Sequence, residues 1–235
     1  MLPMSLLKEV SESDDSLFSF AKDLYDGGLG KYTHLGTDKP EFIAAVRHDL
    51  TKGVQDWLPL LQDEADYAFS KEFGDSTEWT TVPLYAKVYQ LVSLLSGRIF
   101  VGLPLSRQQE WIQSSISYTM TLVQVGREAQ ALNPIIKPLL VPFLPSVRHT
   151  KKLLRDAKLW MDPFVKEIVS QNDKENSAVI QAGSRGTWIS WLLKYLPADL
   201  RTAERIGIDQ MLVGFAAIFT SALTGTHVRS QTNNI

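Results

Sequence analysis

Met211-Leu-Val-Gly-Phe-Ala-Ala-Ile-Phe-Thr-Ser221 is an uncharged stretch in which apolar side chains occupy every side of a helix. It continues an amphipathic segment that begins at about residue 198. A helix that is apolar all round is normally enclosed by other elements at the centre of a domain. We therefore expect the segment of about 198–225 to form the longest or most buried helix of the fold.

The same segment bears on whether the chain crosses a membrane. Its longest uncharged part, residues 210–225, is shorter than the roughly 20 residues that a membrane-spanning helix needs. Asp209 directly precedes this part. The sequence therefore predicts a buried core helix and no membrane span.

Apolar side chains at three- and four-residue steps recur along the rest of the chain. They predict helices over about 50–69, 82–96, 107–127 and 147–169, with Gly97 closing the second of these. The polar stretch 171–186 predicts a mobile loop. Alternating strand patterns are scarce, so the expected fold is mostly α, in a single domain over residues 1–235.

Composition and motifs exclude several functions. The net charge of −2 gives no field that favours nucleic acid, and no motif for a nucleotide, a metal or a hydrolase nucleophile is found. The absence of cysteine among 235 residues excludes disulfides, zinc–cysteine sites and a thiolate ligand to haem within this chain. One basic cluster, interpreted as a solvated helix face, contains His149, Lys151, Lys152, Arg155 and Lys158.

A series of short phrases, in order and spacing, resembles fungal microsomal cytochromes P450, particularly the group around ent-kaurene oxidase. The phrases are LGKYT at 29–33, FIAAVRHDLT at 42–51, QDE at 62–64, EW at 78–79, SGRIFVGLPL at 96–105, EW at 110–111, YT at 118–119, PLLVPFLP at 138–145 and FAAIFTS at 215–221. They cover nearly the whole chain, except for a tail at 226–235 that matches nothing. The resemblance implies a partial cytochrome P450 fold.

The resemblance also implies roles for four residues. The phrase at 215–221 would lie on the helix that crosses the distal face of the haem, where Ala216 and Ala217 let the porphyrin approach. The hydroxyl of Thr220 would help to deliver protons to oxygen, and Arg47 would contact a haem propionate. The alternatives are a threonine that bonds back to its own helical turn and a solvated surface arginine.

Three positions depart from the common pattern of the family or have no catalytic role in it. Phe219 stands where an acidic residue or histidine is frequent, which argues against an ordinary proton relay. Ile43 occupies a position where many members have tryptophan. Arg98 matches a family position and is interpreted as structural.

Family members are about twice as long as this chain. They begin with a membrane anchor and continue, beyond the central helix, to an E-x-x-R pair and the cysteine loop, and neither E-x-x-R nor cysteine occurs here. We therefore expect a truncated relative of a monooxygenase that lacks the N-terminal anchor and the C-terminal haem-thiolate half, inactive alone, with no haem bound as a thiolate complex. The alternative is a non-catalytic helical protein that binds a hydrophobic small molecule or a partner enzyme.

For the intact family, the resemblance implies haem as cofactor, NADPH-cytochrome reductase as partner and the endoplasmic reticulum membrane as location. It implies a terpenoid-type substrate for this group. Apolar side chains on the central helix, Phe215, Ile218 and Phe219, would flank the substrate pocket.

Overall fold

The computed structural model describes residues 3–14, 17–74, 78–133, 135–172 and 188–232, and every regular element within them is helical. The expectation of a mostly α fold is confirmed. The elements are η1 (Met4–Leu6), α1 (Leu7–Glu12), α2 (Phe20–Gly27), α3 (Gly30–Thr33), α4 (Pro40–Ala45), η2 (Val46–Leu50), α5 (Val54–Phe73), α6 (Leu84–Phe100), η3 (Leu105–Arg107), α7 (Gln109–Ala131), α8 (Lys137–Leu140), η4 (Val141–Phe143), α9 (Pro145–Asn172), α11 (Trp188–Tyr195), η5 (Ala198–Leu200) and α12 (Ala203–Thr232).

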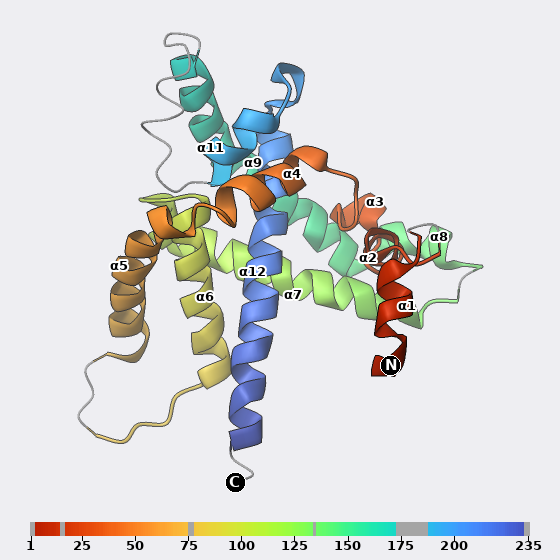
Figure 1. Cartoon of the computed structure of the whole chain (residues 1–235), viewed down its shortest axis with the longest axis horizontal. Coiled ribbons are helices and arrows are strands. Elements are labelled where there is room, and N and C mark those ends of the chain that lie inside the picture. Colours follow the sequence, from red (N-terminus) through yellow and green to blue (C-terminus); the bar gives the residue numbers. More distant parts are fainter. Residues whose placement is uncertain (1–2, 15–16, 75–77, 134, 173–187, 233–235) are drawn as a thin grey trace.

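Helix α12 runs through the centre of the molecule and packs against α9, α6 and α7 (Figure 1). With 30 residues it is the longest helix in the described part of the chain, as the sequence predicts. It begins later than expected, because residues 198–200 form the separate turn η5. It also continues beyond residue 225, through Thr232.

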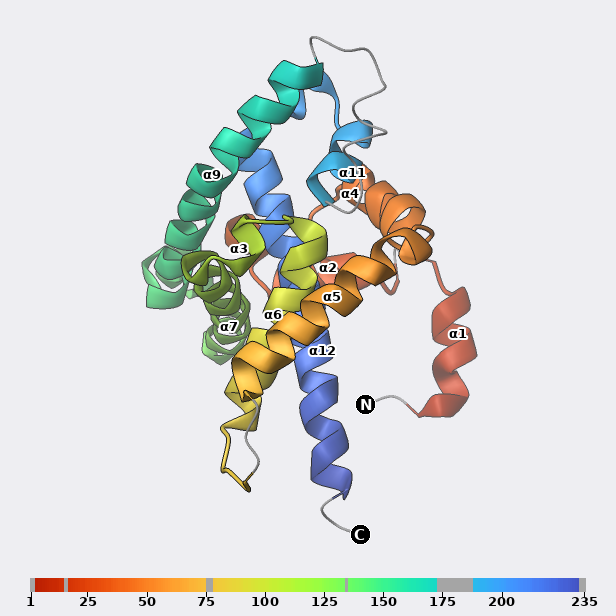
Figure 2. The same cartoon turned by 90° about the vertical axis from the view of Figure 1, so that its left-hand side faces the viewer.

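The two halves of α12 differ in how they are covered. In the first half Met211, Leu212 and Val213 are buried on different sides of the helix, whereas in the second half Ala216 and Thr220 are exposed. Figure 2 shows the C-terminal end of α12 extending past the neighbouring helices. Full enclosure of the apolar run, expected from its composition, therefore holds only for its first turn.

The prediction of no membrane span is not confirmed. Residues 203–224 of α12 are long and apolar enough to cross a membrane by length and composition, although half of this stretch is buried against other helices. The core helix of a soluble protein gives the same signal, so the evidence for a span is weak.

The main core joins the N-terminal and C-terminal parts of the chain around a buried tryptophan. Trp188 of α11 packs edge-on against Phe42 of α4 at 4.8 Å and against Phe100 of α6 at 6.4 Å between ring centroids. Such edge-to-face contacts add about 0.5–1.5 kcal/mol per pair to the burial itself. They hold α4 and α11 over the end of α6.

Two glycines allow close approaches between elements. A Cβ on Gly207 of α12 would lie 3.1 Å from backbone atoms of Ala157 and Lys158, so α9 and α12 cross nearly in contact. A Cβ on Gly97 would lie 3.3 Å from Ser106. The prediction that Gly97 closes its helix is wrong, because α6 continues to Phe100 and the glycine serves the packing of η3.

Two predicted segments fall largely outside the described residues. The expected mobile loop at 171–186 overlaps the end of α9 at residues 171–172, and the structure does not describe 173–187. Of the unmatched tail at 226–235, residues up to Thr232 belong to α12, and 233–235 lie outside the described part.

Candidate functional site

Three of the four predicted site residues lie together on the second half of α12. Ala216 and Thr220 are one turn apart and both exposed, and Ala217 is half-buried beside them. The Thr220 hydroxyl donates a hydrogen bond of 2.6 Å to the carbonyl oxygen of Ala216. This is the bond back to its own helical turn that a threonine with a purely structural role would make. It leaves the lone pairs of Thr220 Oγ1 free to accept a hydrogen bond from a ligand or water.

This part of α12 carries no charged side chain and is largely apolar. No charged residue occurs between positions 210 and 226. The half-buried rings of Phe215 and Phe219 stack at 5.5 Å with an interplanar angle of 14°. We name the exposed side of α12 formed by Phe215, Ala216, Phe219, Thr220 and Leu223 the open face.

Ile218 does not belong to this face. Its side chain is buried in a cluster with Tyr89 of α6 and Ala222 of α12. The expectation that Ile218 flanks a substrate pocket is therefore wrong, because helical geometry turns it away from Ala216 and Thr220.

Arg47 lies on a different element, the π-helical turn η2. It is exposed, and within the described residues its guanidinium has no hydrogen bond or ion pair. The turn itself is anchored, since Asp49 accepts a hydrogen bond of 2.8 Å from the Tyr195 hydroxyl and forms an ion pair with Lys194, both of α11. The structure thus holds Arg47 on a fixed turn but does not bring it into contact with the open face.

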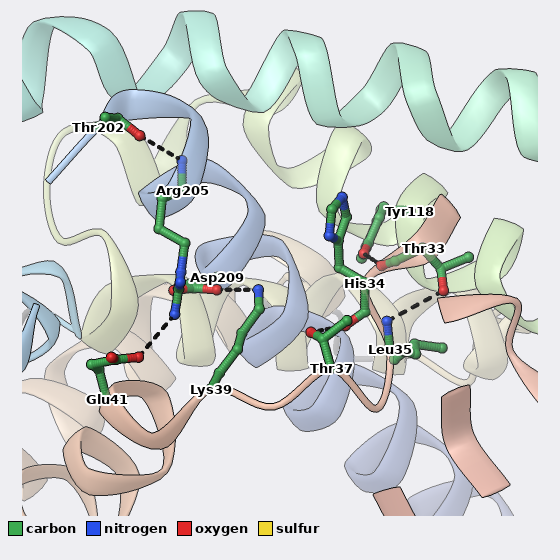
Figure 3. Close-up of polar contacts among 10 residues, drawn as sticks. All are labelled: Thr33, His34, Leu35, Thr37, Lys39, Glu41, Tyr118, Thr202, Arg205 and Asp209. Atoms are coloured by element: carbon green, nitrogen blue, oxygen red, sulfur yellow. Dashed lines mark hydrogen bonds and ion pairs between the residues drawn. The ribbon is translucent and has the colours of Figure 1, made fainter. Parts of the chain in front are cut away.

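A buried charge network lies at the start of α12 (Figure 3). Asp209 is fully buried and pairs with Lys39, which precedes α4, and with Arg205, whose Nε donates to Asp209 Oδ2 at 2.7 Å. Arg205 also reaches Glu41 at 3.2 Å. Burial lowers the pKa of Lys39, and the charge of Asp209 opposes this effect. The network fastens the chain before α4 to α12.

Sequence reasoning noted Asp209 only as the charge before an apolar run. The i, i+4 spacing of Arg205 and Asp209 could have indicated their pairing. No sequence signal indicates Lys39, because it lies 170 positions away. Partners that are distant in sequence are set by tertiary structure alone.

A second buried carboxylate, Glu64 of α5, supports the structural interpretation of Arg98. Arg107 donates to Glu64 through Nε at 3.1 Å and through a terminal nitrogen at 2.8 Å, and Arg98 Nε lies 3.6 Å away as an ion pair. The Arg107 guanidinium also stacks on the Tyr67 ring at 3.7 Å. These contacts join α5 to α6 and η3, far along the chain from the open face.

The residues present fit part of a haem site. The small Ala216 and the uncharged open face suit the flat apolar surface of a porphyrin, and the unpaired Arg47 suits a carboxylate. No cysteine is available as a proximal ligand. Within the described residues no group of three or more His, Asp or Glu side chains could hold a metal ion.

Comparison with known proteins finds relatives that align with almost the whole chain. The chain is 41% identical to cytochrome P450 monooxygenase 3 of Gibberella fujikuroi and 34% identical to cytochrome P450 monooxygenase ascG of Acremonium egyptiacum, in each case over 97% of this chain. Over 93% of the chain it is 30% identical to cytochrome P450 monooxygenase ataF of Aspergillus terreus. It spans 43–44% of the length of these three relatives.

No protein-family model matches the chain. No solved structure matches it either. The relatives nevertheless define a class, the fungal monooxygenases, and they align with almost every residue of this chain. The chain belongs to the cytochrome P450 monooxygenase family and corresponds to a part of the fold of its members.

Proposed function

We propose that this chain forms the distal side of the haem pocket of a fungal cytochrome P450 monooxygenase and that, by itself, it has no haem-thiolate monooxygenase activity. The observation that carries the proposal is the open face of α12. It is uncharged, and it presents the exposed Ala216 and Thr220 one helical turn apart. An exposed apolar side of a central helix is normally covered by another part of the protein, by a partner or by a ligand.

Each of the four residues has a role in this proposal. Haem, when bound, supplies oxygen activation. Ala216 and Ala217 leave room for a flat ring, because their side chains end at Cβ. Thr220 holds a proton at Oγ1, where its present acceptor is the carbonyl oxygen of Ala216 at 2.6 Å. Arg47 offers a permanent, unpaired charge for a carboxylate.

The lack of activity follows from the chemistry of the iron ligand. In cytochromes P450 a cysteine thiolate donates electron density to the iron and favours cleavage of the O–O bond. This chain has no cysteine. The purified, reduced protein under carbon monoxide should therefore lack the red-shifted Soret band of thiolate ligation, and the appearance of that band would refute the proposal.

A hemin titration tests the distal face separately. A charge-assisted hydrogen bond contributes about 1.5–3 kcal/mol, so Arg47→Gln should weaken hemin binding about tenfold or more. Lys52→Gln is the matched control, because Lys52 is an exposed cation close to the same turn. Equal effects of the two substitutions would remove Arg47 from the site.

The substrate is proposed to be a hydrophobic molecule of terpenoid type, oxidised with electrons from NADPH-cytochrome reductase in a complete enzyme at the endoplasmic reticulum. The resemblance to the ent-kaurene oxidase group supports the terpenoid class. The stacked rings of Phe215 and Phe219 suit any rigid hydrocarbon skeleton and do not discriminate among them. Gene deletion followed by metabolite profiling tests whether the locus is active. We expect an unchanged profile. Loss of an oxygenated terpenoid, with build-up of its less oxidised precursor, would show an active locus and a substrate of this class.

The exposed apolar side of α12 also favours a second candidate function, a non-catalytic helical protein that binds a hydrophobic small molecule or a partner enzyme. In that case apolar probes should bind without haem. Leu223→Asp on the open face should then abolish fluorescence enhancement of anilinonaphthalene sulfonate. Leu159→Asp on α9, an exposed leucine away from that face, is the control. An equal response of both variants would count against a specific apolar site.

A further inference from the structure

A cleft lined by basic residues lies where α3, α9 and α12 meet, away from the open face. It has a volume of ≈ 350 Å³, within the range of roughly 300–1,000 Å³ that small-molecule sites occupy. Its lining residues are Lys31, Tyr32, His34, Lys151, Leu154, Arg155, Lys158, Glu204 and Ile208. None of the residues proposed for the haem pocket lines this cleft.

The structure divides the basic cluster that the sequence indicates. Lys151, Arg155 and Lys158 follow one another along one side of α9 and line the cleft. His149 instead lies 3.0 Å from the Ser117 hydroxyl on another side. The interpretation as a simple solvated helix face is therefore incomplete, because α3 adds Lys31 and His34 to the same hollow.

Positive charge in the cleft is only partly balanced. Glu204, the single carboxylate of the lining, is already paired with Lys158 at 3.1 Å. Within the described residues, Lys31, Lys151 and Arg155 have no carboxylate partner. Like charges four residues apart, as in Lys151 and Arg155, destabilise a helix. An anion bound between them would relieve this repulsion. The net charge of the whole chain is −2, so the local excess of positive charge in the cleft does not come from a basic composition.

Part of the lining of the cleft is apolar. The Tyr32 ring lies 4.9 Å from the Lys151 ammonium and 5.8 Å from that of Lys31, so the ring holds both cations at one end. Leu154 and Ile208 are half-buried and line the remaining surface. The lining thus has a cationic end and an apolar wall.

We propose that this cleft binds an organic anion whose phosphate or carboxylate lies among Lys31, Lys151 and Arg155 and whose apolar part lies along Leu154 and Ile208. Arg155 can hold two oxygens of such a head group with its planar fork, and the two lysines add point charges. The inference does not depend on the proposed haem site, because it uses none of the residues of the open face.

Octyl phosphate, below its critical micelle concentration, is the probe. Binding to the full chain is measured by isothermal titration calorimetry, with inorganic phosphate and octanol as the separate head and tail. We expect octyl phosphate to bind more tightly than either part. Each charge-assisted contact contributes about tenfold in affinity, so the double variant Lys151→Gln, Arg155→Gln should weaken binding about a hundredfold.

Lys152→Gln is the matched control, since Lys152 is exposed on the same helix but does not line the cleft. It should leave the affinity within about twofold, because its ammonium lies outside the cleft and its charge is screened by water and salt. All three positions are exposed on the surface, and unchanged circular dichroism verifies folding. Absence of octyl phosphate binding, or an equal loss in Lys152→Gln, would overturn the proposal.

Vesicles identify the source of the anion. Binding to phosphatidylserine vesicles that is lost in the double variant and kept in Lys152→Gln supports the cleft with a lipid head group as its ligand. Binding of octyl phosphate without vesicle binding supports it with a soluble organic anion. Loss of hemin binding in Arg47→Gln would affect neither result, so the two proposals fail separately.

Discussion

Removal of the buried charge of Asp209 should destabilise the protein strongly. Asp209 is 0% exposed and faces the Lys39 ammonium, whose side chain is only 10% exposed. Asp209→Asn keeps the size of the side chain but leaves Lys39 without a carboxylate. Arg205 retains Glu41 as a partner. Breaking a buried pair from one side costs about 3–5 kcal/mol, because it leaves an uncompensated charge in the interior.

An exposed ion pair between α9 and α12 provides the comparison. Lys158 and Glu204 lie 3.1 Å apart with side chains 50% and 65% exposed. Glu204→Gln should cost at most about 1 kcal/mol, since water and salt screen such pairs. Both substitutions replace a carboxylate with an amide on the same helix, so the difference between them measures the effect of burial together with the additional partner of Asp209.

Urea unfolding followed by circular dichroism measures both free energies of unfolding. The double variant Lys39→Met, Asp209→Asn should recover part of the loss, because it removes the buried ammonium as well. A loss of less than about 1 kcal/mol in Asp209→Asn, similar to that in Glu204→Gln, would refute the reasoning. So would a double variant that is less stable than the sum of its single changes.

Two further predictions concern packing and pH. Gly207→Ala should lower the free energy of unfolding by about 1–3 kcal/mol relative to Gly214→Ala. A Cβ at position 207 would lie 3.1 Å from the backbone of α9, whereas no atom of another element lies within 4 Å of a Cβ at position 214. Equal stability of the two variants in urea would contradict a tight crossing. Burial, with the charge of Lys39, lowers the pKa of His34 below its usual 6.5. As the pH drops, the imidazole therefore takes up a proton in the unfolded chain before it does so in the folded protein. The free energy of unfolding should fall as the pH drops below 6.5. Asparagine tolerates the left-handed backbone at this position, where φ is 62°. His34→Asn should therefore lose less stability between about pH 7.5 and 5.5 than the unaltered protein does. An unchanged pH dependence would show that His34 is not the group responsible.

Much of the helical architecture could be predicted from the sequence. Local periodicity sets where a helix can bury a stripe, so the helices α6, α7, α9 and α12 are recognisable without coordinates. The family also follows from the sequence, because phrases such as those at 29–33 and 215–221 keep their order and spacing. The grouping of Ala216, Ala217 and Thr220 required only that they share one helix.

Tertiary structure decided what these local patterns left open. Composition alone predicted enclosure of the whole apolar run, yet exposure of Thr220 depends on which helices reach that end of α12. The role of Gly97 depends on Ser106, and the role of Asp209 depends on Lys39, since close approaches and buried ion pairs join residues that are distant in sequence. The basic cleft arises in the same way, because α3 and α9 contribute charges to one hollow that neither segment forms alone.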